Sequence, residues 1–236
     1  MAHKPADRIR NVVLIGHRGA GKTSLHEAVL FEAGVVNRLG RVEDGTTVSD
    51  FESDEQEREM SIGASVACFE YDGRKINLID TPGKPSFIAD TIASLRVVDA
   101  AVVVVNAVMG VEVHTERLWQ RADREGLARL VFVNMLDRER ADFFRALESL
   151  QSAFGNHVVA TEIPIGSEHE IRGVIDLIDM KAFVAQGEGR GAPEPQEIPG
   201  ELQGQAGVLL DRSLSHLKEL VGRSLFRVRE QAILVG

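Results

Sequence analysis

The chain is poor in the residues that stabilise small secreted proteins and in those that cross membranes. Its single cysteine, Cys68, excludes an internal disulfide, and a thiol-poor chain favours the reducing cytoplasm. No apolar run approaches the roughly 18 residues that a bilayer span requires, and the longest one, 100–105, has the length of a buried strand. The polar N-terminus lacks the apolar segment of a secretory signal. We therefore expect a cytoplasmic protein with no membrane partner.

Basic residues are also in short supply. The chain has 27 Lys and Arg residues against 36 Asp and Glu residues, a formal net charge of −9. Because nucleic-acid binding depends on neutralising phosphates, we expect no general nucleic-acid coat and no sequence-specific DNA partner. One local face could still dock on a nucleoprotein particle. The 236 residues, 44% of them hydrophobic, suffice for one large domain or for a core domain that carries an insertion.

The first two thirds of the chain alternate short apolar runs with amphipathic stretches, which is typical of an α/β sheet. Strands are expected at 12–15, 66–71, 75–79, 101–105, 130–133, 158–160 and 163–165, and helices at 23–32, 115–124 and 140–154. Asp72 and Gly73 predict a tight hairpin turn, because both central positions of such a turn favour positive φ. We therefore predict a mostly parallel sheet of about six strands with one antiparallel edge strand, flanked by helices.

The composition changes after Lys181. Residues 186–207 are rich in Gly, Pro, Gln and Glu and are expected to be irregular, 213–223 could form a helix, and 232–235 one last strand. We expect a core at 1–165, a small inserted subdomain or irregular connection at 166–230, and the start of a final core strand at 231–236. The abrupt end after a strand-like run favours a fragment of a longer protein.

One segment fits the phosphate-loop pattern G-x-x-x-x-G-K-[ST] at every fixed position, between a predicted strand and a predicted helix. Its residues, with the position that follows, are Gly16, His17, Arg18, Gly19, Ala20, Gly21, Lys22, Thr23 and Ser24. Glycines allow successive N–H groups to point at phosphate oxygens. Lys22 would bridge the β- and γ-phosphates of a nucleotide, and the Thr23 hydroxyl would bind Mg²⁺. The alternative is a plain glycine-rich turn.

A second motif, Asp80-Thr81-Pro82-Gly83, follows the predicted strand 75–79. Open α/β sheets bind ligands at the carboxyl ends of their strands, so Asp80 could hold Mg²⁺ and the Gly83 N–H could meet the γ-phosphate. A segment with such a contact senses the state of the nucleotide. Asp-x-x-Gly alone could be an ordinary turn, but its place about sixty residues after the phosphate loop favours a functional interpretation.

A third motif follows the predicted strand 130–133 and consists of Asn134, Met135, Leu136 and Asp137. The Asp137 carboxylate could accept two hydrogen bonds from the ring N–H and amino group of guanine and would repel the acceptor edge of adenine. Asn and Asp also favour helix and turn caps, which is the alternative interpretation.

Together these segments resemble the GTPase domain of elongation factor G. The resemblance extends to 44–50 and 57–62, which look like the first switch region of that family, and to 94–99, 134–143 and 171–177. The last of these is similar to the start of the subdomain that the family inserts late in this domain. The resemblance implies a P-loop GTPase that binds GTP or GDP with Mg²⁺ and hydrolyses GTP to GDP and phosphate in ribosome-coupled translocation. Ser61 would take the place of the family's Mg²⁺-binding threonine.

The sequence departs from the family pattern elsewhere too. Lys84 stands where the family has a water-orienting histidine, and lysine offers donors but no acceptor, so the expected hydrolysis is weak or ribosome-dependent. Met135 replaces the lysine of the guanine motif and supplies an apolar contact without the charge. The sequence also ends before the Ser-Ala segment with which the family contacts guanine.

Three functions stay open on the sequence alone. The first is a ribosome-coupled GTPase in which Gly83 and Lys84 act at the γ-phosphate. The second is a nucleotide-binding switch or ribosome-binding paralogue with little or no hydrolysis, and the third is a remnant that no longer binds nucleotide. The acidic run 52–59 is interpreted as a mobile, solvated switch segment, Cys68 as a core residue, and no zinc site is assigned because no histidines have the required spacing.

Overall fold

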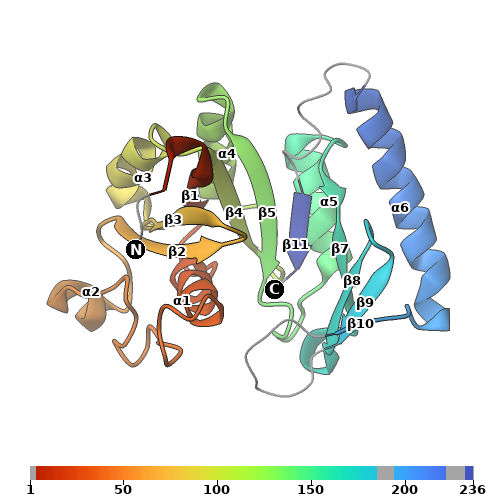
Figure 1. The fold of residues 1–236 in the computed structure, drawn as a ribbon, viewed down its shortest axis with the longest axis horizontal. Helices are drawn as coiled ribbons and strands as arrows, with labels where there is room; N and C mark the ends of the chain where they lie inside the picture. The colour runs from red at the N-terminus through yellow and green to blue at the C-terminus, as the bar shows by residue number, and fades with distance from the viewer. Residues whose placement is uncertain (1–3, 185–193, 222–231, 236) are drawn as a thin grey trace. The chain divides into compact units, whose positions relative to one another are not determined.

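The computed structural model describes residues 4–184, 194–221 and 232–235. The chain divides into two compact units (Figure 1). The first unit comprises Met1–Val104 and Val113–Ala128, and the second comprises Val105–Glu112 and Arg129–Gly236. Each unit contains strands and helices of its own.

The sheet of the first unit has the strand order β2-β3-β1-β4. Its strands are β1 (Ile9–Ile15), β2 (Ser65–Tyr71), β3 (Arg74–Asp80) and β4 (Ala100–Asn106). Strand β1 pairs in parallel with β3 and with β4, whereas β2 pairs with β3 in the antiparallel sense. The prediction of a mostly parallel sheet with one antiparallel edge strand is confirmed. The carboxyl-terminal half of β1 is fully buried because it has a strand on either side.

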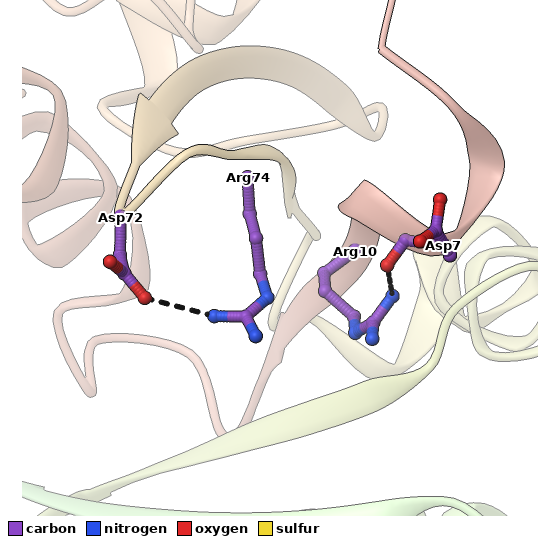
Figure 2. Close-up of polar contacts among 4 residues, drawn as sticks. All are labelled: Asp7, Arg10, Asp72 and Arg74. Carbon is purple, nitrogen blue, oxygen red and sulfur yellow. Dashed lines mark hydrogen bonds and ion pairs between the residues drawn. The ribbon is translucent and has the colours of Figure 1, made fainter.

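The hairpin between β2 and β3 turns at the two residues that the sequence indicates. Asp72 and Gly73 have φ values of 46° and 70°, so both central residues have positive φ. Figure 2 shows the guanidinium of Arg74 directed at the Asp72 carboxylate, with 3.1 Å between Nη1 and Oδ2. Nearby, Arg10 Nη1 donates to the Asp7 carbonyl at 3.1 Å. Both contacts are exposed and contribute little to stability, so the hairpin depends on its turn and on the pairing of β2 with β3.

The described part of the first unit contains four α-helices, at least two of which contact the sheet. They are α1 (Lys22–Glu32), α2 (Ser53–Arg58), α3 (Ile88–Leu95) and α4 (Val113–Arg124), with a short 3₁₀ turn η2 (Pro85–Phe87) before α3. Helix α1 contacts β1, β2 and β3, and α3 contacts β1 and α4. In α4, Leu118, Trp119 and Ala122 are buried at helical spacing, which explains why the amphipathic pattern predicted this helix.

The second unit contains a parallel group of strands and one amphipathic helix. Strand β11 (Ala232–Val235) pairs in parallel with β5 (Ala128–Asn134) and with β6 (Val159–Ala160). Helix α5 (Phe143–Phe154) begins after Asp142, whose side chain accepts the Arg145 N–H at 3.0 Å. The predicted strand at 232–235 and the predicted helix before Phe154 are confirmed.

A small antiparallel sheet with the strand order β10-β9-β8-β7 also belongs to the second unit. Its strands are β7 (Glu162–Ile165), β8 (Gly173–Asp176), β9 (Lys181–Val184) and β10 (Pro195–Gln196), and a 3₁₀ turn η3 (Glu168–Glu170) lies between the first two.

The long helix α6 (Gly200–Val221) corrects the prediction for the region after Lys181. Residues 200–207 were expected to be irregular but are helical, and the helix begins well before 213. The three glycines in its first half each lower helix propensity by about 1 kcal/mol. Ala206 is completely buried on this helix, and tertiary packing outweighs that propensity. Part of the predicted irregular segment, 186–193, lies outside the described residues. No helix in the described part of the chain is long and apolar enough to cross a membrane.

Candidate functional site

Lys22 is the buried cation of the phosphate loop in the first unit. Its side chain is 6% exposed, and Nζ donates to the carbonyl oxygens of Gly16 at 3.2 Å and His17 at 3.1 Å. Burial lowers the pKa of Lys22 to about 8, although the charges of Asp80 and Asp50 act in the opposite direction. An ammonium that is held against loop carbonyls is ready to exchange these weak neutral acceptors for phosphate oxygens.

Two glycines allow the backbone to approach Lys22 closely. Gly16 has φ of 150°, and a Cβ placed there would overlap the carbonyl oxygen of Val104. A Cβ at Gly83 would contact Lys22 Nζ and would lie 2.7 Å from both N and Cα of Arg18. Gly83 therefore lies against the phosphate loop and the lysine, at a place where no other residue fits.

Three predicted metal ligands meet at the carboxyl end of β3. The Thr23 hydroxyl donates to Asp80 Oδ2 at 2.6 Å and lies 3.0 Å from the Ser61 hydroxyl. Asp80 is 1% exposed, and its Oδ1 has no hydrogen-bond partner of regular geometry among the described residues. Burial raises the pKa of Asp80 to about 6, against the effects of the Thr23 hydrogen bond and of Lys22.

Asp50 is a second buried carboxylate that the sequence interpretation did not assign to the site. It is 2% exposed, and neither of its oxygens has a hydrogen-bond partner of regular geometry within the described ranges. Burial raises its pKa to about 6, the nearby Ser61 hydroxyl opposes this rise, and the charge of Asp80 adds to it. An acidic residue followed by an apolar one in a loop gives no periodic signal, so only the tertiary structure identifies it.

These oxygen donors fit a magnesium ion. Mg²⁺ prefers oxygen ligands and usually takes only one or two carboxylates from a protein. Thr23, Ser61 and Asp80 supply two hydroxyls and one carboxylate, and the unpartnered oxygen of Asp80 needs a cation or a water molecule. Within the described residues, no group of three or more His, Cys, Asp and Glu side chains could hold a metal ion, so the hydroxyls are an essential part of this candidate site.

Buried polar contacts hold the segment before α2 against α1. His26 Nδ1 lies 2.8 Å from the Ser49 hydroxyl, and the Glu27 carboxylate accepts the Val48 N–H. His26 and Glu27 are both almost fully buried, and burial lowers the pKa of His26. The contacts give this segment a defined place beside the candidate metal ligands.

The acidic run 52–59 is exposed to solvent as predicted, with the exception of Glu55. Residues Ser53–Arg58 form α2, and Glu55 is only 4% exposed. Its Oε1 accepts the N–H groups of Ile62 at 2.9 Å and Gly63 at 3.1 Å. Glu55 therefore fixes the backbone just after Ser61. The Glu55 carboxylate is therefore a positioning group. The sequence does not distinguish it from the acidic residues around it. Cys68 is half-buried on β2.

The side chain of Lys84 lies outside this buried cluster. Lys84 is exposed at the start of η2, and its ammonium lies 5.8 Å from the centre of the Phe87 ring. Such a contact between a cation and an aromatic face is worth about 0.5–1 kcal/mol at an exposed site. The backbone before it is more firmly held, because the Thr81 hydroxyl donates to the Leu14 carbonyl at 2.6 Å.

The predicted base-recognition residues lie in the second unit, after β5. The Asn134 carbonyl accepts the Ala107 N–H at 2.9 Å, and the Asn134 side-chain oxygen accepts the Met135 N–H at 2.8 Å. Met135 has φ of 62°, and its sulfur accepts the side-chain N–H of Asn106 at 3.2 Å. Leu136 is buried, whereas Asp137 is exposed. The loop is thus anchored at its first three positions and presents the Asp137 carboxylate to solvent.

The parallel sheet, the phosphate loop and the aspartate at the end of β3 define the fold of a P-loop nucleoside triphosphatase. The family model of the elongation factor Tu GTP-binding domain matches residues 7–212 of the chain. Elongation factor G of Thermotoga neapolitana is 39% identical over 215 residues, and that of Chlamydia trachomatis is 40% identical over 212 residues. The crystal structure of a protein from Thermus thermophilus matches with a TM-score of 0.85 at 30% identity, covering 97% of this chain and 37% of that one.

The chain therefore belongs to the elongation factor Tu GTP-binding domain family, as a translational GTPase domain of the elongation factor G type. The two elongation factor G alignments cover 91% and 89% of this chain but only 31% and 30% of the relatives. The chain thus spans about a third of the length of the relatives that it matches.

Proposed function

We propose that this chain binds GTP and GDP and hydrolyses GTP to GDP and phosphate, coupled to the ribosome during elongation in the cytoplasm. One observation carries the proposal: Lys22, Thr23, Ser61 and Asp80 meet at the carboxyl end of β3 as a buried cation, two hydroxyls and a carboxylate with an unpartnered oxygen. Residues 166–230 would be the inserted subdomain of the elongation factor G type.

Lys22 and the phosphate loop would bind the β- and γ-phosphates. Phosphoryl transfer depends mainly on positioning and on stabilising charge at the transferred group. Lys22 Nζ already donates to loop carbonyls and Gly83 lies against it, and the Gly83 N–H would donate to the γ-phosphate. Water would attack the γ-phosphorus and GDP would leave, with these donors holding the negative charge. His17, Arg18, Gly19, Ala20, Gly21 and Ser24 complete the proposed phosphate-binding segment.

Thr23, Ser61 and Asp80 would hold Mg²⁺ when nucleotide is bound. The ion would supply neutralisation of phosphate charge. Asp80 has to be ionised for this role, and burial opposes its ionisation in the free chain. Asp50 faces the same restriction. The two carboxylates would therefore add negative charge to the site most readily when a cation is present.

Asn134, Met135 and Asp137 would select guanine. The exposed carboxylate of Asp137 can accept the two N–H groups on the guanine edge, and the thioether of Met135 can pack on the base. This assignment separates affinity from specificity, because Met135 contributes apolar contact and Asp137 contributes the hydrogen bonds.

Lys84 argues for slow intrinsic hydrolysis. A protonated lysine cannot accept a hydrogen bond from an attacking water, and this one lies over the ring of Phe87. A nucleotide-binding switch with little hydrolysis is therefore the second candidate function. The first candidate requires the ribosome to reposition Lys84 or to supply the missing group.

Phosphate release with and without ribosomes separates the two candidates. We expect slow GTP hydrolysis by the chain alone and at least about tenfold stimulation by ribosomes, which corresponds to about 1.4 kcal/mol at the transition state. Lys84→Ala should lower the stimulated rate, and Lys84→His should restore an acceptor. Equal stimulated rates in the original chain and in Lys84→Ala would contradict a role for Lys84. Tight nucleotide binding without any stimulation would favour the switch.

A further inference from the structure

His114, in the first turn of α4, is a buried imidazole that the nucleotide site described above does not use. It is 5% exposed, and among the described residues neither of its ring nitrogens has a hydrogen-bond partner. A buried polar group without a partner destabilises the folded chain. The other buried histidine of the first unit, His26, pairs with Ser49 through Nδ1 and lacks a partner only at Nε2, whereas His114 lacks a partner at both nitrogens.

His114 contacts the phosphate loop through the side chain of His17. Its ring packs edge-to-face on the ring of His17, with 6.4 Å between the centroids and 75° between the planes. His17 is the second residue of the loop, and its carbonyl accepts a hydrogen bond from Lys22. Within the first unit, the side chain of His17 therefore links His114 to the loop backbone that would surround the phosphates.

We propose that His114 is a positioning residue of the phosphate loop that takes up a proton when nucleotide phosphates bind, so that nucleotide affinity increases as the pH falls. The proposal rests on the nucleotide binding proposed above and couples it to the uptake of one proton. The phosphate-loop motif alone does not predict this coupling, because His114 lies outside the motif.

Electrostatics gives the linkage its direction. Burial lowers the pKa of His114 below its ordinary value of 6.5, and His17, Lys22 and Arg117 lower it further. These groups come from the phosphate loop, from α1 and from α4 itself, and none of them is an acid. In the free chain His114 is therefore neutral at pH 7. Negatively charged phosphates bound at Lys22 would offset the effect of these basic groups and raise the pKa of His114.

The size of the effect follows from the same linkage. Each unit by which bound phosphates raise the pKa of His114 increases affinity about tenfold at pH values below both pKa values, compared with alkaline pH. The phosphates of GDP also titrate near neutral pH. The pH dependence of GDP affinity must therefore be compared between the original chain and a variant that cannot take up the proton.

His114→Gln is the suitable variant, because glutamine keeps a donor and an acceptor but does not titrate. GDP binding is measured by calorimetry with Mg²⁺, in two buffers of different ionisation enthalpy, from pH 8 to pH 6. Between these limits, the affinity of the original chain should increase about 3- to 10-fold more than that of His114→Gln. On binding GDP in this pH range, the original chain should take up more protons than His114→Gln. His169→Gln, at an exposed position in the second unit, is the matched control and should behave like the original chain.

Three outcomes are decisive. Equal pH dependence in the original chain and in His114→Gln overturns the inference while nucleotide binding stands. Absence of GDP binding in the original chain overturns the proposed function itself. If His114→Gln does not fold, the imidazole of His114 is followed by NMR in the original chain, where its pKa must rise on addition of GDP, and an unchanged pKa overturns the inference.

Discussion

The two units place the charged groups of their nucleotide motifs differently. In the first unit the motif lysine and aspartate are buried, and in the second unit the motif carboxylate is exposed. Around the phosphate loop, Lys22 and Asp80 are buried, and Asp80 retains an oxygen without a regular partner in the described structure. After β5, the backbone of Asn134 is paired, Leu136 is buried as an apolar anchor, and the Asp137 carboxylate is exposed.

This difference separates stability from recognition. Buried charges that lack good partners lower the stability of the free domain and are relieved when a ligand supplies the missing charge. An exposed carboxylate costs little in the free chain, so it can be changed without a large effect on folding. Variants around the phosphate loop should therefore change affinity and stability in opposite directions, whereas variants of Asp137 should change guanine binding and base preference without changing stability.

The largest expected effect is that of Lys22→Met. Loss of the ammonium should weaken GDP binding at least about 100-fold, because a charge-assisted contact to phosphate is removed. The free energy of unfolding of the nucleotide-free chain at pH 7 should rise, because the lowered pKa of Lys22 shows that burial of its charge is unfavourable. Calorimetry and urea unfolding measure the two quantities. Lys181→Met, at an exposed strand position, is the control and should change neither. A fall in the free energy of unfolding alongside the loss of affinity would contradict the expected opposite changes in stability and affinity.

Asp80→Asn should show the next largest effect, on the pH dependence of stability. The pKa of Asp80 is raised from 3.8 to about 6, so its favourable contribution is complete below pH 3.8 and is lost as the pH rises through 6. At pH 8, without nucleotide or Mg²⁺, the variant should be more stable than the original chain by about 2 kcal/mol. Its Mg²⁺-dependent gain in GDP affinity should disappear. Parallel pH profiles of unfolding for the two proteins would contradict the burial argument.

Asp137→Ala should change base preference by about tenfold without destabilising the chain. A hydrogen bond to a charged group is worth about 1.5–3 kcal/mol. Inosine diphosphate lacks the guanine amino group, so the original chain should bind GDP about tenfold more tightly than inosine diphosphate, and the variant should bind both alike. Competition titrations test this preference. A preference that survives in Asp137→Ala would assign base recognition to other residues.

Ser49→Ala should have the smallest effect. Removal of the hydroxyl that pairs with His26 should lower the free energy of unfolding by about 1 kcal/mol. Ser152→Ala, at an exposed position on α5, is the control and should be close to neutral. Denaturant unfolding of both variants gives the comparison, and equal effects would mean that the contact between His26 and Ser49 contributes nothing.

Local chemistry explains what the sequence predicts well. The hairpin at Asp72 and Gly73, the strand β1 and the amphipathic helix α4 depend on turn preferences and periodicity, which neighbouring residues encode. The phosphate loop is also local, and its glycines and lysine are contiguous. These elements and the family were therefore accessible before the structure.

The rest depends on contacts between residues far apart in the chain. Asp50 lies just before the acidic run 52–59 and Glu55 lies within it, in α2, where the composition indicates solvent exposure, but both side chains are buried. His114 gives no motif, and its contact with His17 emerges only from the packing of α4. Residues 200–207 contain glycines and were expected to be irregular, yet they form the start of α6. The assigned roles of Lys84 and Asp137 stay predictions that the experiments above test, and the assigned role of Met135 stays a prediction.

The central claim is that this chain binds guanine nucleotides through Lys22 and discriminates them from adenine nucleotides. Its most direct test is a titration of the 236-residue chain with fluorescent GDP and Mg²⁺, followed by competition with GTP and with ATP. The account predicts saturable binding that GTP displaces, with ATP at least about 100-fold weaker. Absence of binding, or equal displacement by ATP, would contradict it.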